Sequence, residues 1–256
     1  MRSFVTHPKN PIRSWSPSKE STFAECPAHA AFDITHKPAQ DDGPALVHGR
    51  KVHDELASVA MGQRAAVTCK ESAPYLLNKV FLDELAAIEA PRAAGDLQAE
   101  LEVAVDCELK LVDWRAKDAW WRLKIDLLYR PNPSKLIITD WKTGKPRAKD
   151  KAQLEQYAVA GALLAKVDVI ETRLVYLPSN TVDAALYKIG DVKRLAKKWK
   201  ARGEEITNPK LRILATPTES ACRFCPHKAS IGGPCKYEFT KHSVAGLRHK
   251  WGGGSL

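Results

Sequence analysis

The sequence predicts a mixed α/β protein in which a helical N-terminal part precedes a sheet of several strands. Apolar residues at helical spacing dominate the first part of the chain, as at Val47, Val52, Leu56 and Val59. Further along, the period changes to strict alternation, as in Leu101–Val105. Strands interrupted by a helical stretch favour a mixed central sheet flanked by helices over an all-α or all-β fold.

The N-terminal elements follow from capping and breaking residues. Ser18 is a good N-cap, so we expect a helix over 18–31. The run 37–43 contains Pro, Asp and Gly and predicts a loop. Apolar residues at helical spacing then predict helices over 44–61 and 74–90.

The sheet is expected to begin near residue 99. Alternating apolar residues predict its strands, and Pro131 with the next three residues predicts a tight connection between two of them. The end of the chain, 251–256, is rich in glycine and is expected to fray. The expected elements are strands over 99–112, 119–130 and 135–142, a helix over 152–165, strands over 171–178 and 182–189, and a basic helix over 190–206.

Length and composition indicate one folded domain. The 256 residues are 44% apolar, enough for a sizeable core, and no apolar run approaches the roughly 18 residues of a membrane span. Met1–Ser21 is polar and carries three prolines, which excludes a signal peptide, so we expect a cytoplasmic protein. We interpret 1–256 as a single domain with a helical part (14–98), an α/β core (99–206) and a cysteine-rich segment (207–240).

The charge favours a polyanionic partner. The formal net charge is +10, with 40 Lys and Arg against 30 Asp and Glu. An excess of this size is typical of proteins that bind nucleic acid, although many basic proteins bind nothing charged.

The strongest chemical signal lies in the strand 135–142. Alternation places Leu136, Ile138, Asp140 and Lys142 on one face, which is apolar at first and charged at its end. Asp126 belongs to the preceding strand, and antiparallel pairing brings its carboxylate near Asp140. Two carboxylates held close repel unless a cation lies between them. An Asp–Lys salt bridge is the alternative; the second acid favours a Mg²⁺ or Mn²⁺ site with Lys142 beside a metal-bound water.

These residues resemble the core of the PD-(D/E)XK nuclease superfamily, in its RecB-like and CRISPR-associated form. Asp126 matches the first acid of the motif, and Asp140-Trp-Lys142-Thr-Gly-Lys145 matches the second acid and the lysine. The glycine that usually precedes the first acid is missing. The resemblance implies a restriction-endonuclease-like core, with metal ligands from Asp126, Asp140 and the Trp141 backbone carbonyl.

Three further features fit this resemblance. Gln153-x-x-x-Tyr157 matches an element beside the catalytic centre of the family, with Gln156 as the alternative glutamine. His53, in Gly49-x-x-x-His53, matches a family histidine of the metal shell, although the nearby His48 is easily confused with it. The family often carries an acid on the strand before the first Asp, and Glu100 and Glu102 are both candidates here.

Four cysteines form a second pattern. Cys222 and Cys225 are one turn apart and Cys235 follows, a spacing that suits one metal centre. Cys26 is the fourth candidate. One early and three late cysteines resemble the layout of iron–sulfur nucleases, which implies a 4Fe-4S cluster that joins the termini. Zinc is the alternative, with His227 as a substitute ligand, and the remaining Cys69 and Cys107 are expected to be incidental.

Basic residues follow the active strand. Lys145, Arg147, Lys149 and Lys151 leave it in one loop, where a phosphate backbone would pass. A second run, 193–202, holds six basic residues around Trp199, which we expect to stack on an unpaired base unless the run is simply a solvated face. Nothing resembles a base-reading helix, so little sequence specificity is expected.

The resemblance implies a metal-dependent deoxyribonuclease. We expect an exonuclease on single strands or duplex ends, of a bacterial cell or a phage-infected host, active in recombination, repair or phage DNA processing, with an oligomer conceivable. The alternatives are a non-catalytic DNA-binding or assembly module on the same fold, and a zinc-stabilised nucleic-acid-binding protein.

Overall fold

The computed structural model of the chain describes residues 4–36 and 43–239. Most of the expected loop 37–43 and the expected frayed end 251–256 therefore lie outside the described residues. The chain forms two compact units. Of the described residues, the larger comprises 14–17 and 43–204, and the smaller comprises 4–13, 18–36 and 205–239.

The larger unit is built on a six-stranded mixed sheet in the order β3-β2-β4-β5-β6-β7. Neighbouring strands are antiparallel except β5 and β6, which are parallel and are connected through helix α5. The strands are β2 (Leu97–Val105), β3 (Leu111–Val112), β4 (Trp121–Asn132), β5 (Lys135–Lys142), β6 (Val169–Tyr176) and β7 (Thr181–Lys188).

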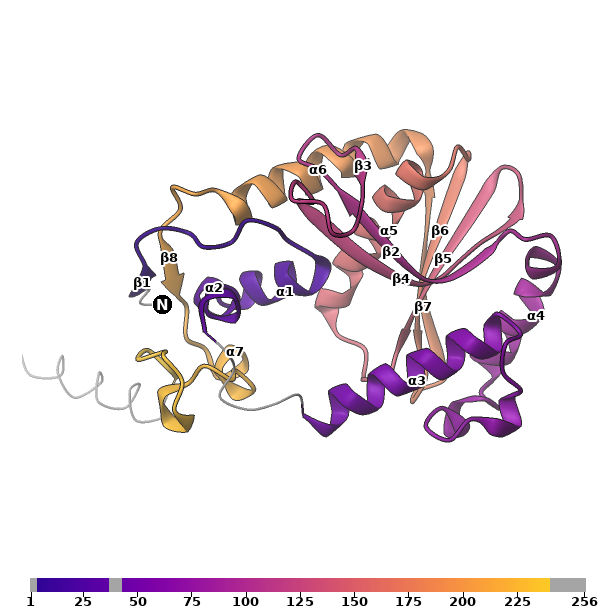
Figure 1. Cartoon of the computed structure of the whole chain (residues 1–256), viewed down its shortest axis with the longest axis horizontal. Helices are drawn as coiled ribbons and strands as arrows, with labels where there is room; N and C mark the ends of the chain where they lie inside the picture. Colours follow the sequence, from indigo (N-terminus) through magenta and orange to yellow (C-terminus); the bar gives the residue numbers. More distant parts are fainter. Residues whose placement is uncertain (1–3, 37–42, 240–256) are drawn as a thin grey trace, which may run out of the picture. The chain divides into compact units, whose positions relative to one another are not determined.

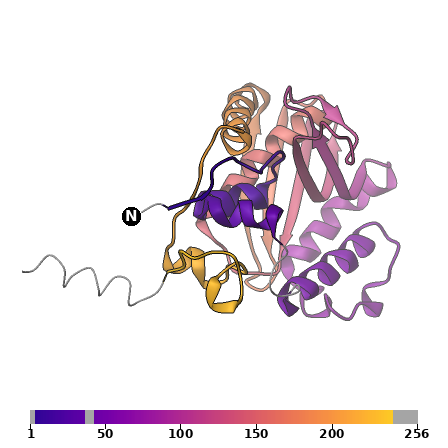
Figure 2. The ribbon, with the colours of Figure 1, turned by 60° about the vertical axis from the view of Figure 1, so that its left-hand side comes forward.

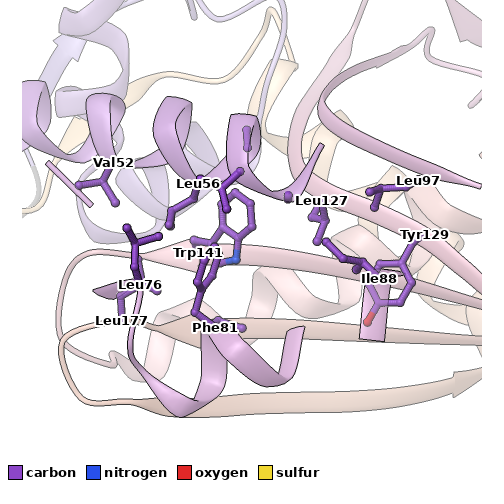
Figure 3. Close-up of a cluster of buried hydrophobic side chains, with 14 of the residues drawn as sticks. Val52, Leu56, Leu76, Phe81, Ile88, Leu97, Leu127, Tyr129, Trp141 and Leu177 are labelled. Atoms are coloured by element: carbon purple, nitrogen blue, oxygen red, sulfur yellow. The ribbon is translucent and has the colours of Figure 1, made fainter. Parts of the chain in front are cut away.

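Helices cover both faces of this sheet, which confirms the predicted mixed α/β fold. Helices α3 (Pro44–Ala60) and α4 (Lys79–Ala93) lie against one face (Figures 1 and 2). Their apolar sides pack on Leu127 and Trp141 in the core cluster drawn in Figure 3. Helix α5 (Lys151–Leu164) packs on the other face, where Gly161 lets it approach Leu136 and Ile138 so closely that a Cβ would meet both side chains at 3.0 Å.

A buried carboxylate fixes α4 on the sheet. Glu84 accepts a hydrogen bond from Thr139 Oγ1 of β5 at 2.9 Å. It also forms an ion pair with Arg173 Nη1 of β6 at 3.3 Å. Arg173 also donates to the hydroxyl of Tyr129 on β4. Because each polar group of this buried set has a partner, its desolvation is offset, and α4 is held in one position.

The segment around Trp15 belongs to the larger unit through an aromatic stack. Trp15 lies flat on Trp121, with ring centroids 4.8 Å apart, and also stacks on Trp199 of helix α6 (Ile189–Thr207). A Cβ on Gly203 of α6 would come within 2.4 Å of Trp15 Nε1. Glycine is therefore required there for the helix to pass the indole ring.

The smaller unit joins early and late parts of the chain. Strands β1 (Phe4–His7) and β8 (Ile213–Ala215) pair antiparallel, and Asn10 Nδ2 donates to the carbonyl of Ile206 at 2.6 Å. Its helices are α1 (Pro17–Glu25), α2 (Pro27–Thr35) and α7 (Glu219–Arg223). The short 3-10 helices of the whole chain are η1 (Ala66–Thr68), η2 (Ala73–Tyr75), η3 (Ala148–Asp150) and η4 (Ala229–Ile231).

Some element boundaries differ from the expected ones. The single helix expected over 18–31 is wrong: it is divided at Cys26-Pro27, because Pro27 has no N–H to continue α1 and instead starts α2 at its first position. The strand expected over 99–112 is two strands separated by a turn. None of the helices in the described residues has the length and apolar composition needed to cross a bilayer.

Candidate active site

The site forms where β4 and β5 stop pairing. Their ladder runs as far as the pair Leu127 and Thr139. Beyond this pair, the Asp126 side chain replaces a backbone carbonyl as acceptor. Its Oδ2 accepts a hydrogen bond from the Trp141 amide of β5 at 2.7 Å. Asp126 and Asp140 are both only 5% exposed, so two acidic side chains share a buried position.

Asp140 is held from the α5 side. Its Oδ1 accepts hydrogen bonds from the Tyr157 hydroxyl at 2.5 Å and from Gln153 Nε2 at 3.0 Å. Gln153 also accepts from Lys142 Nζ at 2.7 Å, and that ammonium lies 2.6 Å from Asp140 Oδ2. Gln153 and Tyr157, four residues apart on one helix face, thus connect the acid and the lysine of the strand motif.

His53 enters the site from α3. Its Nδ1 lies 3.2 Å from Asp126 Oδ2, and its ring packs edge-on against Trp141. Gly49, one turn earlier, lies beside the end of β5: a Cβ there would be 3.3 Å from Thr143 Oγ1. The small residue therefore lets α3 come close enough for His53 to reach the carboxylates. His48 lies on the outside, hydrogen-bonded to Glu71.

Glu100 is the acid of β2 that joins the site. One ligand atom each of Glu100, His53 and Asp126 can be chosen so that all three lie within 4.8 Å of one another. Glu100 has φ +53°, a left-handed conformation that a non-glycine residue rarely adopts inside a strand. It also makes an ion pair with Lys124. Glu102 is exposed and outside this group, because it lies two residues further along β2, opposite Lys124 of β4 and not opposite Asp126.

The electrostatics of the group favour a cation. Burial and the neighbouring Asp140 raise the pKa of Asp126, more than His53 and the Trp141 amide lower it. Burial lowers the pKa of His53, but the hydrogen bond and charge of Asp126, with the charges of Asp140 and Glu100, raise it to about 9. Three acids therefore concentrate negative charge at one point.

Two carboxylate oxygens in this group are buried and accept no hydrogen bond from the described residues: Glu100 Oε1 and Asp140 Oδ2. The second lies beside the Lys142 ammonium without an aligned hydrogen bond. Leaving the buried Glu100 Oε1 without a donor costs free energy unless another partner is supplied. Oxygen ligands with one imidazole are a donor set that suits Mg²⁺ or Mn²⁺.

A pocket of about 730 Å³ opens in front of these residues. Gly49, Arg50 and His53 line it from α3, and Glu100, Lys124 and Asp126 from β2 and β4. The loop after β5 supplies Lys145 and Arg147, and Asp150 fixes this loop by accepting from the Arg147 amide at 3.1 Å and from the Tyr176 hydroxyl at 3.1 Å. Acidic groups thus lie at the base of the pocket and basic groups around it.

Comparison with known proteins identifies the family. The pattern of the PD-(D/E)XK nuclease superfamily matches residues 14–230, which is most of the chain. The chain belongs to the PD-(D/E)XK nuclease superfamily. The comparison with curated proteins found no match.

Two solved structures are distantly similar to this superfamily member. A crystal structure described as a "Putative exonuclease" from Eubacterium rectale is 12% identical, with a TM-score of 0.48, and the match covers 91% of this chain and 93% of that chain. The crystal structure of SSO0001 is 12% identical, with a TM-score of 0.37, and the match covers 89% and 88% of the two chains.

The residues that the superfamily motif indicated lie together in the structure. His53, Asp126, Asp140, Lys142, Gln153 and Tyr157 form one connected group. Gln156 does not join it: the side chain is buried, and its Oε1 has no hydrogen-bond partner among the described residues. Of the four basic residues expected at DNA, Lys145 and Arg147 line the pocket, whereas Lys149 and Lys151 are exposed outside it.

The prediction that Trp199 stacks on a base is wrong. Trp199 is 4% exposed, and its Nε1 donates to Glu155 at 3.1 Å. The side chain belongs to the aromatic stack with Trp15, because the amphipathic α6 turns its apolar side to the sheet and its basic side outward. Several of those basic residues are already paired, for example Lys198 with Glu155.

The four cysteines of the second pattern lie in the smaller unit. Cys26, Cys222, Cys225 and Cys235 all line one small cavity. Burial, with the charges of the other three sulfurs, raises the pKa of the Cys225 thiol to about 11. Burial, with the charges of Cys26, Cys222 and Glu238, also raises the pKa of the Cys235 thiol. Four thiolates in one buried place repel unless a cation lies among them, so the donor set fits a metal centre. Cys69 is buried in the core of the larger unit, and Cys107 is exposed.

Proposed function

We propose that this superfamily member is a divalent-metal-dependent deoxyribonuclease. The observation that supports it most is the convergence of Glu100, Asp126 and His53, where the buried Glu100 Oε1 accepts no hydrogen bond from the described residues. His53, Asp126, Asp140 and the Trp141 backbone carbonyl, with Glu100, would hold the cation. A bound Mg²⁺ or Mn²⁺ neutralises phosphate charge and lowers the pKa of a water.

The protein side chains divide the remaining work. Lys142 lies between Gln153 Oε1 and Asp140 Oδ2, and from there its ammonium reaches a phosphate oxygen or an attacking water in the pocket. Tyr157 is 1% exposed, so it acts on the reaction through Asp140 and not through DNA. Arg50, Lys124, Lys145 and Arg147 surround the pocket and would bind the phosphates on either side of the scissile bond.

The test is cleavage of end-labelled single-stranded DNA. We expect degradation with Mn²⁺ or Mg²⁺ and none with EDTA. Lys142→Ala is expected to cleave at least about 10²-fold more slowly while it still binds DNA, because the lost group acts on the reacting phosphate. Lys166→Ala, an exposed lysine near the other end of α5, is the matched control. Normal cleavage by Lys142→Ala, or by the wild type in EDTA, would disprove the proposal.

We further propose that the enzyme acts on DNA ends or single strands. The pocket is a local hollow lined by basic side chains from α3, β4 and the loop after β5, which suits contacts to phosphates without reading of bases. Linear and covalently closed circular single strands of equal sequence separate the two modes. An exonuclease degrades the linear strand alone, and equal loss of both strands would show an endonuclease.

We propose that the four cysteines hold one structural metal centre, a 4Fe-4S cluster with zinc as the alternative. The convergence of the four thiols in one cavity supports the centre, and the layout of one early and three late cysteines supports the iron. Iron, sulfide and zinc contents of protein purified without oxygen, together with its visible spectrum, distinguish the two. Protein that contains neither iron nor zinc would disprove both.

A further inference from the structure

A second group of metal-ligating side chains lies in the smaller unit. His29 and Asp33 are on α2, four residues apart, and His227 comes from the segment after α7. Since residues at i and i+4 share a helix face, the two α2 side chains point the same way. The group is separate from the carboxylates of the larger unit.

The donor atoms are close together. His227 Nε2 lies 2.7 Å from Asp33 Oδ1, and His29 Nε2 lies 3.6 Å from the same oxygen. All three ligand atoms lie within 4.8 Å of one another. Around a tetrahedral Zn²⁺ with bonds of about 2.0–2.1 Å to nitrogen and oxygen, neighbouring ligand atoms are about 3.3 Å apart. The two measured separations fall on either side of that value.

Burial argues for more than a hydrogen bond. His227 is 0% exposed, and among the described residues its imidazole forms a hydrogen bond through Nε2, to Asp33. Burying an imidazole with this one hydrogen bond, to a carboxylate that is itself 41% exposed, is a costly way to join two segments. A metal–nitrogen bond at Nε2 would offset that cost, and the exposed side of Asp33 leaves a fourth position open to water.

The surroundings fix the two rings. The His29 and His227 rings meet edge-on with centroids 5.6 Å apart, and Phe32 packs on His227 at 5.7 Å. His227 follows Cys225 by two residues, and His29 follows Cys26 by three, so both imidazoles are carried by the same two segments as the cysteines. Yet the donors of this group are two nitrogens and one oxygen, which differ in chemistry from four sulfurs.

We propose that His29, Asp33 and His227 bind a zinc ion, with water as the fourth ligand. Two neutral imidazoles and one carboxylate are a ligand set that zinc accepts in three-ligand sites. The ion joins α2 to the C-terminal segment independently of whatever the cysteines hold. The chain therefore carries one more zinc than the cysteine centre and the active site account for.

The experiment measures zinc in the full-length chain. Wild-type protein, purified without a histidine tag, is dialysed against low free zinc, and zinc and iron per chain are counted by elemental analysis. We expect His29→Ala to lose one zinc per chain and to bind zinc at least about tenfold more weakly, with its iron unchanged. His36→Ala, another histidine at the end of α2, is the matched control and is expected to keep the wild-type zinc content.

The His29→Ala variant distinguishes a zinc site from a simple hydrogen bond between His227 and Asp33. The His227–Asp33 contact survives in His29→Ala, so a site without metal predicts no change in zinc content. Asp33→Asn gives a second reading, because asparagine can still accept from His227 but is a poor zinc ligand, and we expect the same loss. Equal zinc in wild type, His29→Ala and Asp33→Asn would overturn the proposal. Since active-site residues are intact in all three proteins, DNA cleavage is scored separately.

Discussion

At the scale of single residues, the site is organised by oxygen atoms that lack donors. Asp140 Oδ1 accepts from Tyr157 and Gln153, whereas Asp140 Oδ2 and Glu100 Oε1 accept no hydrogen bond from the described residues. One oxygen of Asp140 is thus fixed by two hydrogen bonds, and the other lies 2.6 Å from the Lys142 ammonium. This asymmetry orients the carboxylate before a cation or a phosphate arrives.

Tyr157→Phe tests that orientation. The substitution removes one hydrogen bond to a charged oxygen, which contributes about 1.5–3 kcal/mol, so we expect cleavage to slow by about 10- to 100-fold. The Mn²⁺ concentration for half-maximal activity should rise, and KM for DNA should stay the same, because the buried Tyr157 does not reach the substrate. Tyr187→Phe on β7 is the control. A changed KM with unchanged metal dependence would instead indicate a DNA contact.

The strained backbone of Glu100 gives a second prediction. A left-handed conformation costs a non-glycine residue about 1–2 kcal/mol, which glycine does not lose. Glu100→Gly should therefore keep or raise the urea midpoint while cleavage falls and more Mn²⁺ is needed. Glu102→Gly, at an exposed position of the same strand, should lower stability and leave the metal dependence unchanged. Full activity of Glu100→Gly would remove Glu100 from the metal site.

At the scale of elements, hydrogen bonds from Glu55 of α3 position the segment that follows this helix. The buried Glu55 accepts hydrogen bonds from the Lys70 and Ser72 amides at 3.0 and 2.8 Å and from Ser72 Oγ at 2.9 Å. Burial raises the pKa of Glu55, but these bonds and the charge of Arg64 lower it more, so that the pKa lies below its ordinary value. The carboxylate therefore organises a connection that has little regular structure of its own.

This contact predicts acid sensitivity. Because the folded pKa of Glu55 is depressed, its contribution to stability is present above the unfolded pKa of about 4.3 and is lost as the pH falls through the folded value. Glu55→Gln should lower the free energy of unfolding at pH 7 by about 1–3 kcal/mol, and the difference from wild type should shrink at acid pH. Urea unfolding at both pH values measures it, with Glu89→Gln, at an exposed position of α4, as control. An undiminished difference in acid would contradict the carboxylate's role.

At the scale of the whole molecule, charge is distributed unevenly. The net charge of +10 coexists with a buried acidic group, and Arg50, Lys124, Lys145 and Arg147 surround that group at the pocket. A polyanion would thus be attracted by the basic surround and would meet the proposed cation-binding site at its centre. The acids repel phosphate most strongly at one point, and a divalent ion bound at that point would neutralise their charge.

The salt dependence of DNA binding tests this distribution. In the Asp140→Asn background, which prevents cleavage, the logarithm of the binding constant should fall linearly with the logarithm of salt concentration. Arg147→Ala should reduce the slope by about 0.7–1, since one phosphate contact is lost. Lys110→Ala, an exposed lysine that does not line the pocket, should leave the slope unchanged. A slope unaffected by Arg147→Ala would place the DNA elsewhere.

Much of this architecture is readable from the sequence because it depends on local periodicity. The alternation in 135–142 and the helical spacing in 44–61 and 152–165 correspond closely to β5, α3 and α5. The residues of the strand motif and of Gln153-x-x-x-Tyr157 are close in the chain, so strand pairing and one helical turn suffice to bring them together. The break at Cys26 does not follow from periodicity, because the apolar stripe continues across it and Pro27 alone marks the start of a new helix.

The sequence by itself determined the fold class, the superfamily motif and the candidate acids. Only the tertiary structure decided between His48 and His53, between Gln153 and Gln156, and between Glu100 and Glu102, because each pair is too close in sequence for periodicity to separate. It also buried Trp199 and brought His29 and Asp33 to His227, almost 200 residues away. Contacts of that kind depend on how elements pack and on backbone angles such as that of Glu100, which no local pattern encodes.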